Sequence, residues 1–136
     1  MFTEGCLMTR RILTIVLWLI TLGTVAVASA ETLDELAVTR LIKQCQKGEA
    51  SACRVLAYRY DKGTGVTQDY AKAVELYRKA CDGQEAGGCF NLGVTYATGI
   101  GVRQSDDEAR KFLGKACDLK SESGCTQYAR LKTEKK

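Results

Sequence analysis

The stretch from Ala50 to Glu85, ASACRVLAYRYDKGTGVTQDYAKAVELYRKACDGQE, is followed directly by a second block, Ala86 to Ser121, which aligns with it without a gap. Thirteen of the 36 paired positions are identical. The cysteines show the same period, because two sets of three are each spaced by 36 residues: Cys45, Cys81, Cys117 and Cys53, Cys89, Cys125. A fixed period of this length is the signature of a repeat protein.

Within each block the apolar residues follow a helical period. Cys53, Leu56, Ala57 and Tyr60 lie at positions i, i+3, i+4 and i+7, which is the spacing of one helix face. A second helical pattern follows in the same block, so each repeat predicts two helices. Extending the pattern in both directions predicts helices near residues 32–46, 50–61, 70–82, 86–98, 106–118 and 122–132.

Glycine and capping residues mark the ends of these helices. Gly63 and Gly99 stand where the first helix of each block has to end, and glycine readily takes the left-handed conformation found there. Asp69 and Ser105 stand before the second helix and have side chains that can accept a hydrogen bond from a free backbone amide. Thr32 begins a similar capping pattern before the first predicted helix.

The cysteines predict disulfide-linked helix hairpins. On one continuous helix, Cys45 and Cys53 would lie about 12 Å apart, well beyond the roughly 7 Å that a disulfide tolerates between Cα atoms. A turn has to intervene, and Gly48, Gly83 and the pair Gly87-Gly88 lie where it can form. Several pairings are possible, and the repeat favours the one that treats every unit alike: Cys45 with Cys53, Cys81 with Cys89, and Cys117 with Cys125. Each bridge would then cross a boundary between repeats.

Metal binding or redox chemistry is the alternative use of these cysteines. The sequence contains no C-x-x-C motif and no histidine, so it lacks the usual ligand patterns of zinc and haem sites. Structural disulfides are the favoured interpretation, and we expect neither a metal nor a cofactor.

The N-terminal residues have the layout of an export signal. Arg10 and Arg11 precede an uncharged stretch, Ile12–Ala30, which ends in the small residues Ala28-Ser29-Ala30. We therefore predict a signal peptide over residues 1–30, with no stable membrane insertion after cleavage. The alternative is an uncleaved signal anchor in the inner membrane, because about 19 uncharged residues almost span a bilayer. The remaining chain is expected in the periplasm or outside the cell, where disulfides form.

Residues 31–136 are predicted to be one repeat domain. Its expected parts are a half repeat, two full repeats and a second half repeat, at 32–49, 50–85, 86–121 and 122–132. The whole chain has a formal net charge of +4, and the domain keeps +3 without its signal peptide. So small a charge does not favour a nucleic-acid partner.

These features resemble the Sel-one-like repeat family, whose repeats are short relatives of the tetratricopeptide repeat. The matching pattern, A-x-x-x-x-x-L-[AG]-x-x-Y-x-x-G-x-G-V, is found at Ala50–Val66 and Ala86–Val102, and Lys72-Ala73 and Arg78-Lys79-Ala80 follow the first copy. Ala57 stands where the family prefers glycine. The C-x7-C at each boundary is similar to the cysteine-rich secreted branch first described in Helicobacter. The resemblance implies an all-α fold, a right-handed solenoid of αα-hairpins stapled by disulfides.

The resemblance implies two kinds of function. Sel-one-like proteins are mostly adaptors or scaffolds that bind other proteins, so a protein or peptide partner is the main expectation. Members of the cysteine-rich branch bind or weakly hydrolyse β-lactams, so that activity is the alternative. The residues give hydrolysis little support, because the four serines of the domain all lack the lysine of the S-x-x-K motif: Ser51, Ser105, Ser121 and Ser123. We predict no catalytic residue.

By analogy to tetratricopeptide arrays, the first helix of each repeat would form the binding surface. The i, i+4 positions opposite the core supply the predicted protein-binding residues: Arg54, Tyr58, Phe90, Val94, Thr126 and Arg130. Tyr, Phe and Arg are enriched at binding hot spots. The alternative is that Tyr58 and Phe90 merely pack on neighbouring helices.

Overall fold

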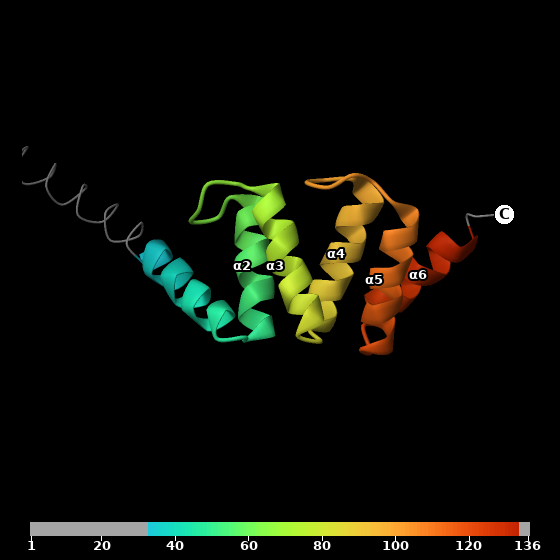
Figure 1. Ribbon diagram of the computed structural model, residues 1–136, viewed down its shortest axis with the longest axis horizontal. Coiled ribbons are helices and arrows are strands. Elements are labelled where there is room, and N and C mark those ends of the chain that lie inside the picture. Colours follow the sequence, from blue (N-terminus) through green and yellow to red (C-terminus); the bar gives the residue numbers. More distant parts are fainter. Residues whose placement is uncertain (1–32, 134–136) are drawn as a thin grey trace, which may run out of the picture. The chain divides into compact units, whose positions relative to one another are not determined.

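The computed structural model describes residues 33–133, and the predicted signal peptide lies outside them. Within this range the chain is all-helical. Residues 33–46 are helical and precede five labelled helices: α2 (Ala50–Lys62), α3 (Tyr70–Asp82), α4 (Ala86–Thr98), α5 (Asp106–Asp118) and α6 (Glu122–Thr133) (Figure 1). None of the helices in this range is long and apolar enough to cross a bilayer. The helices from Ala37 onward belong to one compact unit, described here by itself.

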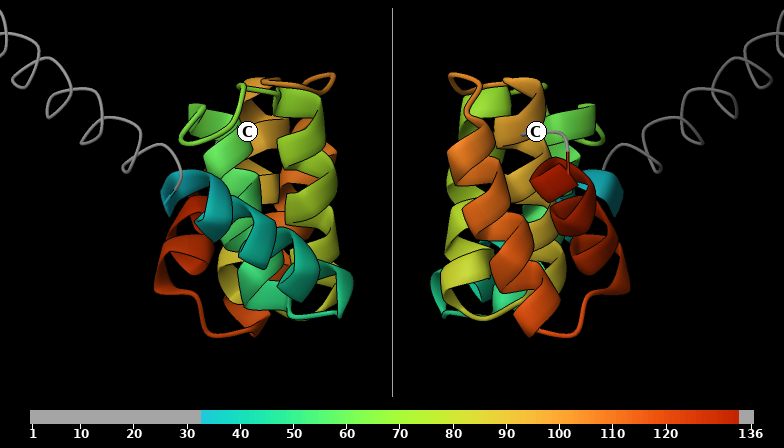
Figure 2. Two further views of the ribbon diagram at one scale, coloured as in Figure 1. Left: turned by 90° about the vertical axis from the view of Figure 1, so that its left-hand side faces the viewer. Right: turned by 90° about the vertical axis from the view of Figure 1, so that its right-hand side faces the viewer.

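The helices of this unit pack in consecutive hairpins. Each of α2 to α5 packs against the helix that follows it, and the chain reverses between them (Figure 1). In addition, α2 contacts α4, and α4 contacts α6. The first helices of successive repeats therefore form one layer, with α3 and α5 in a second layer beside it (Figure 2). This is the αα-hairpin arrangement that the repeat pattern predicts.

Side-chain caps begin the helices largely as predicted. Asp69 accepts a hydrogen bond from the backbone amide of Lys72 at the start of α3. Ser105 does the same for the amide of Glu108 at the start of α5. Glu85 caps α4, which the sequence analysis missed because glutamate is not among the usual capping residues. The capping pattern predicted at Thr32 lies outside the described residues.

Glycine ends the first helix of each repeat as predicted, and Gly48 and Gly83 lie in hairpin turns as predicted, but glycine does not take the left-handed position in every turn. Gly63 and Gly99 are left-handed, with φ values of 70° and 73°. In the turn between α3 and α4, by contrast, Gly83 has a φ of −75°, and Gln84 takes the left-handed position with a φ of 62°. Lys120 does so between α5 and α6. Hydrogen bonds across each turn hold these non-glycine residues in place.

The core lies between the two layers. Leu92 of α4 and Leu113 of α5 are its largest fully buried aliphatic side chains. Around Leu92 the buried residues include Phe112 and Tyr77, and the ring of Phe112 stacks on that of Tyr96 with centroids 5.6 Å apart. The equivalent leucines of the two repeats, Leu56 and Leu92, are thus both core residues.

Three disulfides join the end of one helix to the start of the next. They connect Cys45 with Cys53, Cys81 with Cys89, and Cys117 with Cys125, with Cα–Cα distances of 4.6, 4.4 and 4.4 Å. These are the pairs that the repeat symmetry favours. The bridges differ in burial, because the first two pairs are almost completely buried, whereas Cys117 and Cys125 are partly exposed.

Small residues let the bridged helices approach so closely. A Cβ placed on Gly88 would lie 2.6 Å from the Cβ of Ala80, and one placed on Gly124 would lie 2.8 Å from the Cβ of Ala116. These distances are far below ordinary carbon–carbon contact. Gly87 and Gly88 are therefore not turn residues, as the sequence analysis expected, but part of the first turn of α4, where Gly88 serves helix packing.

A similar close contact between α4 and α5 yields a stability prediction. A Cβ on Gly93 would lie 2.6 Å from Leu113 Cγ, both residues being buried. We expect Gly93→Ala to lower the free energy of unfolding by about 1 kcal/mol. Overpacking destabilises by roughly 1–3 kcal/mol, and the higher helix propensity of alanine offsets less than about 1 kcal/mol of this. Urea unfolding followed by circular dichroism measures the change.

Gly114→Ala provides the matched control. Gly114 is also a helical glycine, but its added Cβ would meet only the edge of the Tyr128 ring, at 3.3 Å. We expect this variant to be more stable than Gly93→Ala by about 1 kcal/mol or more. Equal stabilities of the two variants would show that the α4–α5 contact is not as tight as described.

Candidate functional site

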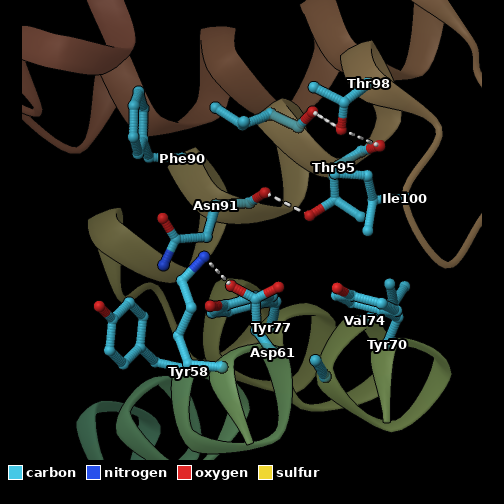
Figure 3. A pocket seen from close by; sticks show the side chains of 13 residues that line it. Tyr58, Asp61, Tyr70, Val74, Tyr77, Phe90, Asn91, Thr95, Thr98 and Ile100 are labelled. Carbon is cyan, nitrogen blue, oxygen red and sulfur yellow. Dashed lines mark hydrogen bonds and ion pairs between the residues drawn. The ribbon is translucent and has the colours of Figure 1, made fainter. Parts of the chain in front are cut away.

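A groove with a cavity of about 240 Å³ lies over α3, between α2 and α4. Its floor consists of the buried α3 residues Ala73, Val74 and Tyr77. The groove is bordered by three α2 residues, five α4 residues and two others: Tyr58, Asp61, Lys62, Phe90, Asn91, Val94, Thr95, Thr98, Tyr70 and Ile100. Tyr58 and Phe90 lie toward one end of the groove, with Tyr70 and Ile100 toward the other (Figure 3).

The walls of the groove combine aromatic and aliphatic surface. Tyr58 is 52% exposed, so about half of its surface is accessible to a ligand. Phe90 packs against the core with part of its ring and leaves part in the groove. Exposed Tyr and half-exposed Phe side chains around a cavity are typical of sites that bind a side chain of a partner protein.

Tyr77 places a polar atom at the floor of this apolar groove. Its side chain is only 4% exposed, and its hydroxyl is bonded to no other residue within 33–133. Burial raises the pKa of the Tyr77 phenol above its ordinary value, and the nearby charge of Asp61 adds to the rise. The phenol is therefore neutral at physiological pH and can both donate and accept a hydrogen bond.

An ion pair between neighbouring α2 residues stands in the groove. The ammonium of Lys62 lies 3.0 Å from Oδ2 of Asp61 and 5.8 Å from the centre of the Tyr58 ring. The hydrogen bond to Asp61 raises the pKa of Lys62 above its ordinary value. Since the Lys62 side chain is more than half exposed, solvent screens this pair and its contribution to stability is small.

Two threonine hydroxyls on α4 belong to one wall of the groove, but each already donates a hydrogen bond to a backbone carbonyl of the same helix. The Thr95 hydroxyl donates to the backbone carbonyl of Asn91 at 2.8 Å, and the Thr98 hydroxyl donates to that of Val94 at 3.0 Å. The side-chain amide of Asn91, in contrast, makes no hydrogen bond within the described part of the chain. Asn91 and Tyr77 thus offer the groove neutral polar groups that are bonded to no other residue within 33–133.

Three of the six residues predicted to bind a partner meet in this groove. Tyr58 comes from α2, and Phe90 and Val94 come from α4. Thr126 and Arg130 lie on α6, both exposed and outside the groove. The structure therefore divides the predicted surface between a groove and a separate helix.

Arg54, the remaining predicted residue, serves another purpose. Its Nε donates to Oε1 of Glu85 at 3.0 Å, while Oε2 of Glu85 accepts from the amide of Gly88. Arg54 thus holds in place the carboxylate that caps α4, and it links α2 to α4. It is not a lining residue of the groove.

Sequence reasoning missed Asp61, Asn91 and the role of Tyr77. The helical period marks Tyr77 as a core position, which is correct, but it does not show that the hydroxyl opens into a groove. The repeat alignment carries a usable signal, because Asp61 and Tyr77 correspond to Ala97 and Leu113 in the second repeat. Polar groups that are absent from the equivalent positions are not needed for the repeat fold.

The serines of the domain lie outside the groove. Ser105 and Ser121 accept hydrogen bonds from backbone amides at the starts of α5 and α6, and Ser51 and Ser123 are exposed residues in the first turns of α2 and α6. Within residues 33–133, no group of three or more His, Cys, Asp or Glu side chains is arranged to hold a metal ion.

Comparison with known families and structures identifies the repeat. The family model of the Sel1 repeat matches residues 50–84 and 86–121, which together make up just over half of the chain. Among proteins with a curated function, none matches the chain significantly.

Several solved structures are similar to the chain. Helicobacter pylori cysteine rich protein B is 36% identical, with a TM-score of 0.64 over 65% of this chain and 67% of that one. A Sel1 repeat protein from Oxalobacter formigenes is 30% identical, with a TM-score of 0.61 over 62% of this chain. The protein c5321, a protective antigen present in uropathogenic Escherichia coli strains, is 37% identical, with a TM-score of 0.60 over 62% of this chain. This chain spans about a third of the Oxalobacter protein (34%) and less than a fifth of c5321 (18%).

The location and family of the protein follow from these findings. Three disulfides, together with the similarity to the Helicobacter pylori protein, indicate an oxidising, extracytoplasmic location. The matched repeats, the six-helix arrangement of residues 33–133 and the disulfides agree with one another. The chain belongs to the Sel1 repeat family.

Proposed function

We propose that this protein is a periplasmic or secreted interaction module that binds an extended peptide segment of a partner protein. The observation that carries the proposal is the groove between α2 and α4, with Tyr58 and Phe90 partly exposed beside a cavity of about 240 Å³. Pockets for drug-sized molecules usually measure roughly 300–1,000 Å³. The smaller cavity suits a single side chain of a peptide that continues along the groove.

Peptide selection tests the proposal. The oxidised protein is used to select peptides from a random display library, and the affinity of the selected peptides is measured by fluorescence polarisation. We expect Phe90→Ala to lower the affinity for the selected peptides about tenfold or more. Truncating an aromatic side chain at a binding hot spot usually lowers the affinity by at least this factor.

Val102→Ala is the matched control. Val102 and Phe90 both pack partly buried against the same core cluster, but Val102 is not part of the groove. The control should retain peptide affinity, and thermal melting shows whether both variants fold. Selected peptides that bind folded Phe90→Ala as well as they bind the unmodified protein would contradict the proposal.

A further inference from the structure

The Asp61–Lys62 pair shows what chemistry the groove accepts. The Lys62 ammonium occupies the groove beside two groups that favour a cation, the carboxylate of Asp61 at 3.0 Å and the face of the Tyr58 ring at 5.8 Å. An aromatic face and a carboxylate are the two elements of protein sites for basic groups. Lys62 is thus an internal occupant of a site for a positive charge.

Lys62 can leave this position at little cost. Its side chain is 54% exposed, and exposed ion pairs contribute little to stability because solvent screens them. Asp61 is less exposed, at 23%, and among residues 33–133 no group is bonded to its second carboxylate oxygen. A second cation can therefore bind Asp61 either together with Lys62 or in its place.

The floor of the groove provides a further acceptor. Tyr77 is buried as a whole residue and lines the groove, and its hydroxyl has no partner among the described residues. Asp61 lies close enough to Tyr77 for its charge to affect the phenol (Figure 3). A ligand group with several N–H donors can bond to both, and Lys and Arg side chains carry three and five such donors.

The remaining lining suits the alkyl stem of such a side chain. Val74 on the floor and Val94 on the wall are apolar, and Phe90 lies across from Tyr58 (Figure 3). Lysine and arginine cover apolar surface with their methylene groups while the charged head reaches a polar partner. The groove thus has apolar walls for the stem and Asp61 with Tyr77 for the head.

The positions one repeat later do not preserve these groups. Asp61, Lys62 and Tyr77 of the first repeat correspond to Ala97, Thr98 and Leu113, and Phe90 of the second repeat corresponds to Thr126 in the C-terminal half repeat. Most positions identical in both repeats are occupied instead by cysteine, glycine or aliphatic residues, whereas Gln68, Lys79 and Asp82 are polar. The polar and aromatic groups of the groove are therefore not required by the fold, which favours a specific ligand for this one groove.

Resting on the proposed peptide-binding function, we infer that the groove holds a lysine or arginine side chain of the partner peptide, bound by Asp61 and Tyr77, with Lys62 as its internal competitor. The alternative is an acidic side chain of the partner peptide, which would bind the Lys62 ammonium instead of the Asp61 carboxylate. The two possibilities predict opposite effects of the same substitutions.

Short capped peptides with a fixed central residue distinguish these cases. The central residue is Lys, Arg, Gln, Leu or Glu, the flanking positions are randomised, and the pools are compared for binding to the oxidised protein. We expect the Lys and Arg pools to bind about tenfold tighter than the Gln pool, the usual value of a charge-assisted contact. Asp61→Asn should remove most of this preference, whereas Lys62→Gln should strengthen binding of the Lys and Arg pools about threefold.

Charge-matched controls show whether an effect on peptide binding comes from the groove residue itself or from the changed net charge of the protein. Asp118→Asn and Lys79→Gln change exposed residues at the ends of α5 and α3, outside the groove. Both should leave the ranking of the pools unchanged. Tyr77→Phe, which removes only the hydroxyl, should weaken the Lys and Arg pools and leave the Leu pool unaffected.

The outcomes separate this inference from the proposed function. If all pools bind alike and Phe90→Ala still weakens them, the groove binds peptides but the preference for a basic side chain is wrong. If the Glu pool binds tightest and Lys62→Gln weakens it, the ligand is acidic and the inference is overturned. If no pool binds, both the inference and the proposed function fail.

Discussion

Reduction of the three disulfides is expected to unfold the repeat domain at room temperature. Each bridge closes a loop with a sequence separation of 8, for which the chain-entropy estimate is about 2.5 kcal/mol. Three bridges together contribute about 7.5 kcal/mol, while the whole stability of a small domain is roughly 5–15 kcal/mol. Reducing all three bridges therefore removes an amount of stability comparable to the whole free energy of unfolding of the domain. Far-UV circular dichroism with and without a thiol reductant measures the effect.

The three bridges should not be equal. Cys81 and Cys89 are both 0% exposed, so replacing this pair with alanine removes buried sulfur contacts in addition to the cross-link. Cys117 and Cys125 are partly exposed, so the same replacement there should cost less. We expect the order of destabilisation to be the central pair first, then Cys45 with Cys53, then the last pair. A reduced, alkylated protein with an unchanged melting curve would contradict the structural role of the bridges.

Leu92→Ala is expected to lower the free energy of unfolding by about 3 kcal/mol, within the roughly 2–5 kcal/mol found for buried leucines. Leu92 is 0% exposed and lies in the cluster that joins α3, α4 and α5. Truncation leaves a cavity that its neighbours cannot fill, because Phe112 and Tyr77 are fixed by their own packing. The shift of the urea midpoint at constant slope gives the value.

Ile100→Ala is the control for this measurement. Ile100 is 47% exposed in the loop between α4 and α5, so its truncation should change stability by less than about 0.5 kcal/mol. A loss below about 1 kcal/mol for Leu92→Ala would mean that the two layers do not share the continuous core described here.

The helices could be predicted from the sequence because their determinants are local. The predicted ends fall within one residue of those observed, for example at Lys62 for α2 and Thr133 for α6. Asp69 and Ser105 cap helices as expected, since a capping side chain bonds to an amide only three residues away. The regular period adds a check, because α2 and α3 have their counterparts, α4 and α5, 36 residues later.

Features that depend on contacts between distant residues could not be predicted in this way. Glu85 is a cap because Arg54, 31 residues earlier, binds its other oxygen. Gly93 is required by the side chain of Leu113 on the next helix.

Three of the six residues predicted to bind a partner line the groove, and this division of the six has a physical reason. Tyr58, Phe90 and Val94 were identified because positions opposite the core face of one helix can be read from its period. The groove needs a second element, however, and its floor belongs to α3, whose Tyr77 the period assigns to the core. Thr126 and Arg130 satisfy the same periodicity but lie on α6, outside this groove.

The central claim is that a partner peptide binds between α2 and α4. An NMR titration of the oxidised, isotope-labelled protein with a selected peptide that has a central arginine tests it most directly. The account predicts the largest shift changes at Tyr58, Asp61, Tyr77 and Phe90, with little change in α6. Shift changes confined to α5 and α6, or none at saturating peptide, would contradict it.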